Sequence, residues 1–444
     1  MIAADTTRRI LPDPIAPDTL ESAGLTLDIV LQLALKTLHF AGDLSGATLA
    51  SRLGLRFSVI EPALHLLKQQ HQVEIAGGAV LGGPSYRYRI TDAGRTRAAL
   101  FLESNHYVGA APVPLAQYRA YMHEYKKHAP HTATRERVRD AFSHLVISDR
   151  VMDQLGPAIN AGHSMFVYGP PGNGKTVISQ AIQRLLDGDI HIPHALEVEG
   201  SIVRMYDPVT HVELPSDTAT DVLDTGSVVD RRWVRCRRPL VMVGGELTLE
   251  ALELSYNAVA GFYKAPVQAL ANGGVLVIDD FGRQRMRPQD LLNRWIVPLE
   301  SRVDYLTLNS GQKFELPFMV LVAFATNIRP QELVDEAFLR RIHYKVLCES
   351  PSYEDFILIF RKYCDSVDVS FERPLVEELL DGYYRPRNLP MRGCHPRDLI
   401  EQSLSLAEYL GRPRQLSADL LRAACDSYFV DDSETMSSAP PMHA

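Results

Sequence analysis

The sequence contains few of the features that mark membrane-spanning or secreted proteins. No apolar run reaches the roughly 18 residues that a membrane span needs, and the first 20 residues lack the apolar core of a signal peptide. Only five cysteines occur in 444 residues, and none of them forms a C-x-x-C pair. Isolated thiols of this kind are typical of a reducing cytoplasm. These absences predict a soluble, cytoplasmic protein without a membrane partner.

An excess of positive charge is also missing. Lysine and arginine number 46 against 54 acidic residues, which gives a formal net charge of −8. This balance argues against a protein that coats nucleic acid, although a local basic surface stays compatible with it. The chain is too long for one ordinary core, so we expect two or three domains.

The most informative stretch follows the short apolar run at residues 165–168. It matches G-x-x-x-x-G-K-[ST] and is made of Gly169, Pro170, Pro171, Gly172, Asn173, Gly174, Lys175 and Thr176. The glycines permit backbone angles that let successive N–H groups surround a phosphate chain, at the start of a helix-like run. We expect Lys175 to reach the β- and γ-phosphates and the Thr176 hydroxyl to hold Mg²⁺. The sequence therefore predicts an ATP site.

Two carboxylates follow a second apolar run. Residues 274–278 form a continuous apolar stretch, which is typical of a strand that is buried on both faces. Ligands of such sheets bind beyond the carboxyl ends of the strands. We therefore expect Asp279 to lie near the phosphate loop and hold Mg²⁺, directly or through water. Asp280 is then positioned to polarise the attacking water.

These two motifs resemble Walker A and Walker B of the AAA+ ATPases. Within that family, the sequence pattern is most similar to the MoxR-like branch. The resemblance implies an α/β fold, with the parallel sheet of a P-loop NTPase and a C-terminal α-helical lid. The second acid of the family is usually glutamate. Asp280 is one methylene shorter, which leaves nucleotide binding intact and bears on the rate of hydrolysis.

Further residues are similar to other parts of this family. Asn327 follows an apolar strand at 318–323 and resembles sensor 1, and Arg397 looks like sensor 2 at the start of a helix. Arg341, with Arg340 as the second choice, resembles the arginine finger that reaches into a neighbouring subunit. The resemblance thus implies a ring, most often a hexamer, in which each pocket is completed by the next subunit.

The N-terminal region is expected to form a separate small domain. Its pattern predicts helices from residue 25, at 46–53 and at 58–70, then strands at 72–75 and 86–91, and a helix from residue 92. This order resembles a winged helix. The third helix offers only Glu61 and Lys68 for reading DNA, whereas arginines cluster on the wing and the helix after it: Arg87, Arg89, Arg95 and Arg97. DNA binding and protein docking both stay open for this domain.

Several other segments have more than one structural or functional interpretation. Four helices are expected at 353–363, 374–383, 396–409 and 417–428. The basic run Arg231, Arg232, Arg235, Arg237 and Arg238 is either a partner surface or the charge of an exposed hairpin. Phe262 and Tyr263 are either a channel grip, as in the family's rings, or the packed face of a core helix. His191 and His194 have no matching ligand cluster, so no metal is expected on them.

The expected organisation follows from these segments. It comprises a flexible leader (1–21), a winged-helix-like domain (22–104), a linker (105–133), an ATPase core (134–349) with a β-hairpin insert (190–245), a helical lid (350–430) and a disordered tail (431–444). The function that this organisation favours is a ring-forming, chaperone-like ATPase that remodels or assembles a protein client chosen by residues 22–104. The alternatives are a DNA-associated regulator with an ATP-driven switch and a nucleotide-held scaffold with slow hydrolysis.

Overall fold

A parallel sheet of five strands forms the centre of the protein. The computed structural model describes residues 9–77, 82–129, 133–215 and 229–429. The strands lie in the order β10 (Leu240–Val243), β13 (Val275–Ile278), β16 (Leu321–Thr326), β5 (Met165–Tyr168) and β17 (Tyr344–Leu347), and every neighbouring pair is parallel. The predicted α/β fold with a parallel sheet is confirmed. All five carboxyl ends therefore meet at one edge of the sheet.

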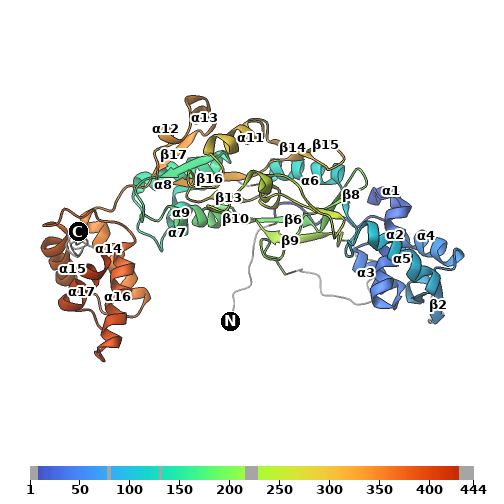
Figure 1. Cartoon of the computed structure of the whole chain (residues 1–444), viewed down its shortest axis with the longest axis horizontal. Coiled ribbons are helices and arrows are strands. Elements are labelled where there is room, and N and C mark those ends of the chain that lie inside the picture. The colour runs from blue at the N-terminus through green and yellow to red at the C-terminus, as the bar shows by residue number, and fades with distance from the viewer. Residues whose placement is uncertain (1–8, 78–81, 130–132, 216–228, 430–444) are drawn as a thin grey trace, which may run out of the picture.

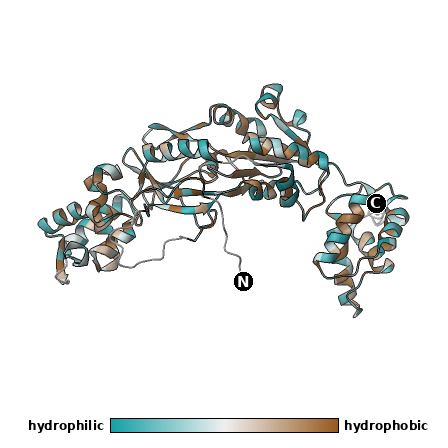
Figure 2. Ribbon diagram, turned by 180° about the vertical axis from the view of Figure 1, so that it is seen from behind, coloured by the Kyte–Doolittle hydropathy of each residue, from teal (hydrophilic) through white to brown (hydrophobic). Residues whose placement is uncertain are grey.

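Helices cover both faces of this sheet (Figure 1). Successive strand residues point to opposite faces, so Phe166, Leu276 and Phe324 enter one core, and Val167, Val277 and Ala323 enter the other. The first core is closed by α11 (Pro288–Ser301) and α13 (Glu336–Arg341). The second is closed by α7 (Arg135–Ala141), α8 (Asp149–Ala161) and α9 (Lys175–Ala181), which continues into η2 (Ile182–Leu185). Two-sided burial explains the continuous apolar run of β13, and Figure 2 shows the hydrophobic residues gathered on the central strands.

Additional strands extend the core beyond this sheet. A second sheet has the order β11 (Ser255–Asn257), β12 (Phe262–Lys264), β8 (Ser201–Arg204), β7 (Ala195–Val198) and β4 (Val113–Pro114). Two antiparallel pairs join β6 (Asp189–Pro193) to β9 (Trp233–Arg237) and β14 (Val303–Thr307) to β15 (Lys313–Pro317). Short helical turns η3 (Leu249–Leu252) and α10 (Val267–Leu270) connect the β11–β12 pair to the core strands, and α12 (Pro330–Leu333) lies between β16 and α13. The expected insert ends too late at residue 245, because β10 pairs with β13 and belongs to the core sheet.

The N-terminal elements match the predicted order of helices and strands. They are α2 (Leu27–Ala41), α3 (Gly46–Leu53), α4 (Phe57–Gln69), β2 (Val73–Gly77), η1 (Gly83–Ser85), β3 (Arg87–Ile90) and α5 (Asp92–Ser104). A strand that the sequence did not reveal, β1 (Asp43–Ser45), pairs with β3 and completes a three-stranded antiparallel sheet. These elements lie at one end of an elongated molecule (Figure 1).

Two segments are more ordered than expected. The backbone N–H of Ile10 donates to Asp189 at 2.9 Å, and Asp13 bonds His191 Nε2 at 3.0 Å. Residues 9–19 and α1 (Leu20–Ala23) therefore pack on the protein instead of forming a flexible leader. The expected linker contains α6 (Leu115–His128), which buries one face against the β6–β9 pair. Proline-rich flanks concealed both features, because they resemble the composition of a connector.

The C-terminal helices form at the opposite end of the molecule (Figure 1). They are α14 (Tyr353–Ser366), α15 (Arg373–Leu379) with a turn of π-helix at η4 (Leu380–Tyr384), α16 (His395–Tyr409) and α17 (Ala418–Tyr428). All four predicted helices are confirmed, and they surround a core of their own. The expected disordered tail lies outside the described residues. None of the helices in the described ranges is long and apolar enough to cross a membrane.

Two of the five arginines in the basic run at residues 231–238 are buried, whereas Arg231 and Arg237 are exposed. Arg232 and Arg238 are buried, and Arg235 pairs with Asp189 at 2.5 Å. Arg232 donates to both carboxylate oxygens of Asp230, which is also buried, and to the carbonyl of Ala23 at 3.0 Å. Neither expected interpretation, a partner surface or an exposed hairpin, describes these buried arginines. Arg232 joins α1 to the insert.

Replacing Asp230 with alanine is expected to lower the free energy of unfolding by about 3–5 kcal/mol, because Arg232 would stay buried without a counter-charge. Urea unfolding followed by tryptophan fluorescence measures this change. The matched control is Glu354→Ala, which removes an exposed partner of Arg373 and should leave the transition in place. An equal response of the two variants would contradict the structural role of the buried pair.

Candidate functional site

The phosphate loop joins β5 to α9 with a backbone that only glycine adopts readily. Gly169, Gly172 and Gly174 have φ angles of 143°, 77° and 73°. A Cβ atom at Gly169 would lie 2.2 Å from the carbonyl oxygen of Cys348, so the close approach of two chains also requires glycine there. Positions 170, 171 and 173 complete the turn, and α9 begins directly at Lys175. The loop therefore has the shape that the motif predicts.

Lys175 lies beneath this loop. Its side chain is buried, and Nζ donates to the carbonyl oxygens of Gly169 at 3.0 Å and Pro170 at 2.8 Å. Burial lowers the pKa of the Lys175 ammonium below its ordinary value, and the nearby Asp280 and Asp279 act in the opposite direction. These carbonyl contacts hold the ammonium at the centre of the loop, where it is available to an anion.

The acidic strand and the phosphate loop converge. Thr176 Oγ1 donates to Asp279 Oδ2 at 2.8 Å, although 103 positions of sequence separate the two residues. Strand β16 lies between β5 and β13 in the sheet, and it brings a third polar residue to the same edge. Asn327 Nδ2 donates to Asp280 Oδ1 at 3.2 Å. The structure thus brings together Lys175, Thr176 and both carboxylates, as the sequence predicts.

Asp280 adopts an unusual backbone conformation. Its φ is 49°, in the left-handed region that costs a residue with a side chain about 1–2 kcal/mol. Its N–H donates to Asp279 Oδ1 at 3.0 Å. The Asp279 carboxylate accepts from Thr176, and the Asp280 carboxylate accepts from Asn327.

A cleft of about 390 Å³ opens between the phosphate loop and the C-terminal helices. This volume falls in the range of sites for small organic ligands, about 300–1,000 Å³. Arg397 lines the cleft from α16; it is 58% exposed and pairs with Asp398. The backbone N–H of Cys394 donates to Gly172 O at 2.8 Å, and that of Gly393 donates to Asn173 Oδ1 at 3.1 Å. Two hydrogen bonds therefore tie the start of α16 directly to the phosphate loop.

Sequence reasoning missed part of the cleft lining. The connection between α7 and α8 contributes residues 144–147, and α14 contributes Lys362 and Tyr363. Lys362 Nζ donates to the carbonyl oxygens of Ser143 at 2.6 Å and Leu145 at 3.1 Å. The sequence pattern predicts a helix from Thr134 through Leu145, whereas α7 ends at Ala141, so that residues 144–147 form a connection that lines the cleft.

Other candidate residues lie away from this cleft. Arg341 Nε pairs with Glu300 at 2.5 Å, and Arg340 pairs with Glu336 at 2.9 Å at the end of α13. Neither arginine lines the cleft of its own chain. The structure of one chain therefore leaves the choice between them open.

The two aromatic residues suggested as a channel grip are packed in a β-hairpin. Tyr263 is buried in β12, where its hydroxyl accepts the N–H of Asn309 at 2.9 Å. Phe262 is half-buried, with its ring 5.9 Å from that of Tyr107. The packed alternative is therefore confirmed in its packing and wrong in its element, because the segment is a hairpin instead of a core helix. The channel grip stays a prediction.

The residues at the carboxyl edge of the sheet fit Mg²⁺ and a triphosphate. Mg²⁺ keeps several waters and takes only one or two protein ligands, typically carboxylate and hydroxyl oxygens. The adjacent oxygens of Thr176 and Asp279 supply such a pair. The buried ammonium of Lys175 and the glycine-rich backbone supply positive charge and space beside it.

Comparison with known proteins gives one family-model match and many similar solved structures. A family model described as a domain of unknown function (DUF8689) matches residues 352–427, which hold α14–α17. No curated protein matches the chain. Among solved structures, similarity extends to the Thermotoga maritima RuvB Holliday junction branch migration motor (14% identity, 64% of this chain and 71% of that chain, TM-score 0.37). NtrX from Brucella abortus is also similar (15% identity, 71% and 65% coverage, TM-score 0.39). At these TM-scores the similarity assigns no activity to this chain.

Proposed function

We propose that this chain is an AAA+ ATPase that binds Mg²⁺–ATP in the cleft and hydrolyses it to ADP and phosphate. The observation that carries the proposal is the 2.8 Å contact of Thr176 with Asp279, beside the buried Lys175. Two motifs far apart in the sequence thereby meet at the carboxyl edge of the sheet. Thr176 and Asp279 supply a pair of metal ligands there, and Lys175 supplies a cation. Such a combination is what phosphoryl transfer from ATP requires.

Each residue has a task in this reaction. Lys175 exchanges its two carbonyl acceptors for phosphate oxygens, and the loop amides bind the rest of the chain of phosphates. Thr176 and Asp279 hold Mg²⁺, which when bound neutralises charge on the β- and γ-phosphates. Asp280 polarises the attacking water, and Asn327 orients Asp280. Arg397 contributes positive charge from the C-terminal helices, on the far side of the cleft.

The wider role follows from the arrangement of the parts. We propose a cytoplasmic, ring-forming ATPase, most often hexameric in its family, in which Arg341 or Arg340 completes the pocket of a neighbour. A protein client is the proposed substrate, with selection by the winged-helix-like residues 22–104. Support comes from the position of these elements at the end of the molecule opposite the C-terminal helices that close the cleft (Figure 1). A client bound there leaves the nucleotide cleft accessible.

Replacing Asp280 with asparagine should reduce ATP turnover by about 10²–10⁴-fold, the range typical of a lost general base, while nucleotide affinity is retained. Steady-state ATPase assays with a nucleotide-binding control measure both quantities. Unchanged turnover would exclude Asp280 as the group that activates water. Asp280→Glu restores the family's usual length, so an increase in turnover would favour a scaffold with slow hydrolysis in the natural protein.

A DNA-associated regulator is the second candidate, favoured by arginines on the exposed wing. The side chains of Arg87 and Arg89 are 59% and 54% exposed, although they pair with Asp43 and Glu74. If this function holds, duplex DNA should bind with a strong salt dependence that is lost in the Arg87→Ala, Arg89→Ala variant. Fluorescence anisotropy at several salt concentrations measures it, with Arg373→Ala as an exposed-arginine control. Co-purification of a protein partner, without DNA binding, would favour the client-remodelling function.

A further inference from the structure

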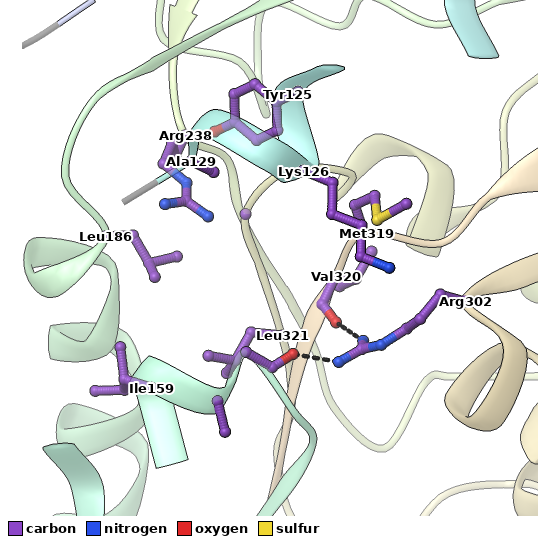
Figure 3. A pocket seen from close by; sticks show the side chains of 13 residues that line it. Tyr125, Lys126, Ala129, Ile159, Leu186, Arg238, Arg302, Met319, Val320 and Leu321 are labelled. Carbon is purple, nitrogen blue, oxygen red and sulfur yellow. Dashed lines mark hydrogen bonds between the residues drawn. The ribbon is translucent and has the colours of Figure 1, made fainter. Parts of the chain in front are cut away.

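A second cavity lies at the edge of the core sheet opposite the phosphate loop. It has a volume of about 100 Å³ and is bordered by residues at the amino ends of three core strands: Gly162 before β5, Gly274 before β13, and Leu321 at the start of β16. Figure 3 shows it from close by. A four-residue strand spans about 13 Å, so this cavity is distinct from the nucleotide cleft.

Arg238 supplies positive charge to the wall of this cavity. Its side chain is only 6% exposed, and it lies over the ring of Tyr125 at 5.8 Å. Nε donates to Gly273 O at 2.7 Å, and Nη1 donates to Asp187 O at 3.5 Å. A guanidinium has five N–H donors, so these two carbonyls satisfy fewer than half of them. A buried cation without an opposite charge is costly.

Arg302 supplies a second guanidinium from the other wall. It follows α11 with a φ of 59°, a position where glycine or asparagine is usual. Its side chain hydrogen-bonds the carbonyl oxygens of Val320 at 3.0 Å (Figure 3) and Gly162, both at the cavity, and contacts His163 Nδ1 at 3.1 Å. Strained backbone conformations of this kind cluster at binding and active sites, and Arg302 lines the cavity.

The surroundings add positive charge and no counter-charge. Lys126 lines the cavity, and the described residues that line it include no aspartate or glutamate. Burial lowers the pKa of the adjacent His163, and the positive charges of Arg302, His343 and Lys126 lower this pKa further. The cavity is therefore electropositive.

The remaining wall is aliphatic, with Ile159, Leu186 and Met319 among its members. By comparison with a cavity of about 150 Å³ that holds benzene, this one accommodates about four to six non-hydrogen atoms. We propose that it binds a small organic carboxylate between Arg238 and Arg302, with a short alkyl part on the aliphatic wall. Guanidinium groups match carboxylates in geometry, and the aliphatic wall disfavours an anion that is polar on every side, such as phosphate.

Titration calorimetry of the full chain tests this site with acetate, propionate, butyrate and inorganic phosphate as probes. A saturating non-hydrolysable ATP analogue with Mg²⁺ occupies the phosphate loop during the titrations. Affinity should rise about fourfold for each added methylene, the equivalent of about 0.8 kcal/mol. Arg302→Gln should weaken butyrate binding at least tenfold, since hydrogen bonds to charged groups contribute about that much.

A second variant keeps the test independent of the buried arginines. Ala161→Leu adds volume to the cavity wall and leaves every charge in place, so it should abolish butyrate binding while the ATP analogue binds as before. The proposal would be overturned if none of the three carboxylates binds with a Kd below about 10 mM. Phosphate that binds more tightly than butyrate, or butyrate binding that Ala161→Leu leaves unchanged, would overturn it as well.

Discussion

Lys175→Ala is expected to lower the affinity for Mg²⁺–ATP by more than about 100-fold, because at least two charge-assisted hydrogen bonds to phosphate oxygens are lost. The buried Lys175 ammonium already lies at the centre of the phosphate loop, held by the carbonyls of Gly169 and Pro170. Alanine leaves both carbonyls facing the phosphates with no cation between them, so repulsion adds to the loss. Equilibrium binding of a fluorescent ATP analogue measures the change.

Lys345→Ala provides the matched control for this variant. Lys345 is on β17, beside the strand that leads into the phosphate loop, and its Nζ also donates to two backbone carbonyls, of Leu339 and Ile342, each at 2.8 Å. Burial lowers the pKa of Lys345 as it does that of Lys175. Loss of Lys345 should therefore reproduce any general effect of removing a half-buried lysine, and nucleotide affinity should stay near that of the unmodified protein. Equal losses in the two variants would show that the phosphates bind elsewhere.

Arg341→Ala is expected to reduce ATP turnover on the order of 10³-fold, the effect of a missing arginine finger. Nucleotide affinity should stay nearly intact, because the arginine would act on the pocket of a neighbouring subunit and only as charge develops on the transferring phosphoryl group. In the single chain Arg341 pairs with Glu300 and is 27% exposed. This pairing holds the guanidinium at the end of α13, and in the proposed ring this end would face the neighbour's cleft.

Arg340→Ala is the internal comparison for this prediction. Arg340 is 77% exposed and pairs with Glu336 one helical turn away, so its loss should have little effect on stability. Turnover measured at saturating ATP, with the oligomeric state checked for each variant, separates the two residues. If only Arg340→Ala lowers turnover, the choice of Arg341 is wrong. If neither variant does, α13 carries no finger.

The core of the fold and of the candidate site could be predicted because its signals are local. The run that ends at Asp279 identifies a strand buried on both faces, and the glycine spacing at 169–174 identifies a loop that other residues cannot form. Parallel strands bring their carboxyl ends to one edge, so the meeting of Thr176 and Asp279 follows from the order of the sheet.

The features that escaped prediction depend on contacts between distant segments. The hydrogen bonds of Lys362 to residues 143 and 145 span more than 200 positions of sequence. No hydrophobic periodicity in the sequence predicts such contacts. Likewise Arg232 is of a residue type that is usually exposed, and its burial depends on bonds to the distant Ala23 and Gln117 as well as on the carboxylate of Asp230. The hairpin that holds Phe262 has strands of three residues, which are too short for alternation to distinguish them from a helix.

The central claim is that the phosphate loop and the acidic strand hold a single Mg²⁺–triphosphate unit. A crystal structure with Mg²⁺ and a non-hydrolysable ATP analogue tests it most directly. We expect Thr176 Oγ1 at about 2.0–2.1 Å from the metal, Asp279 on the same metal directly or through one water, and Lys175 Nζ on the β- and γ-phosphate oxygens. A nucleotide bound elsewhere, or a metal that contacts neither Thr176 nor Asp279, would contradict the claim.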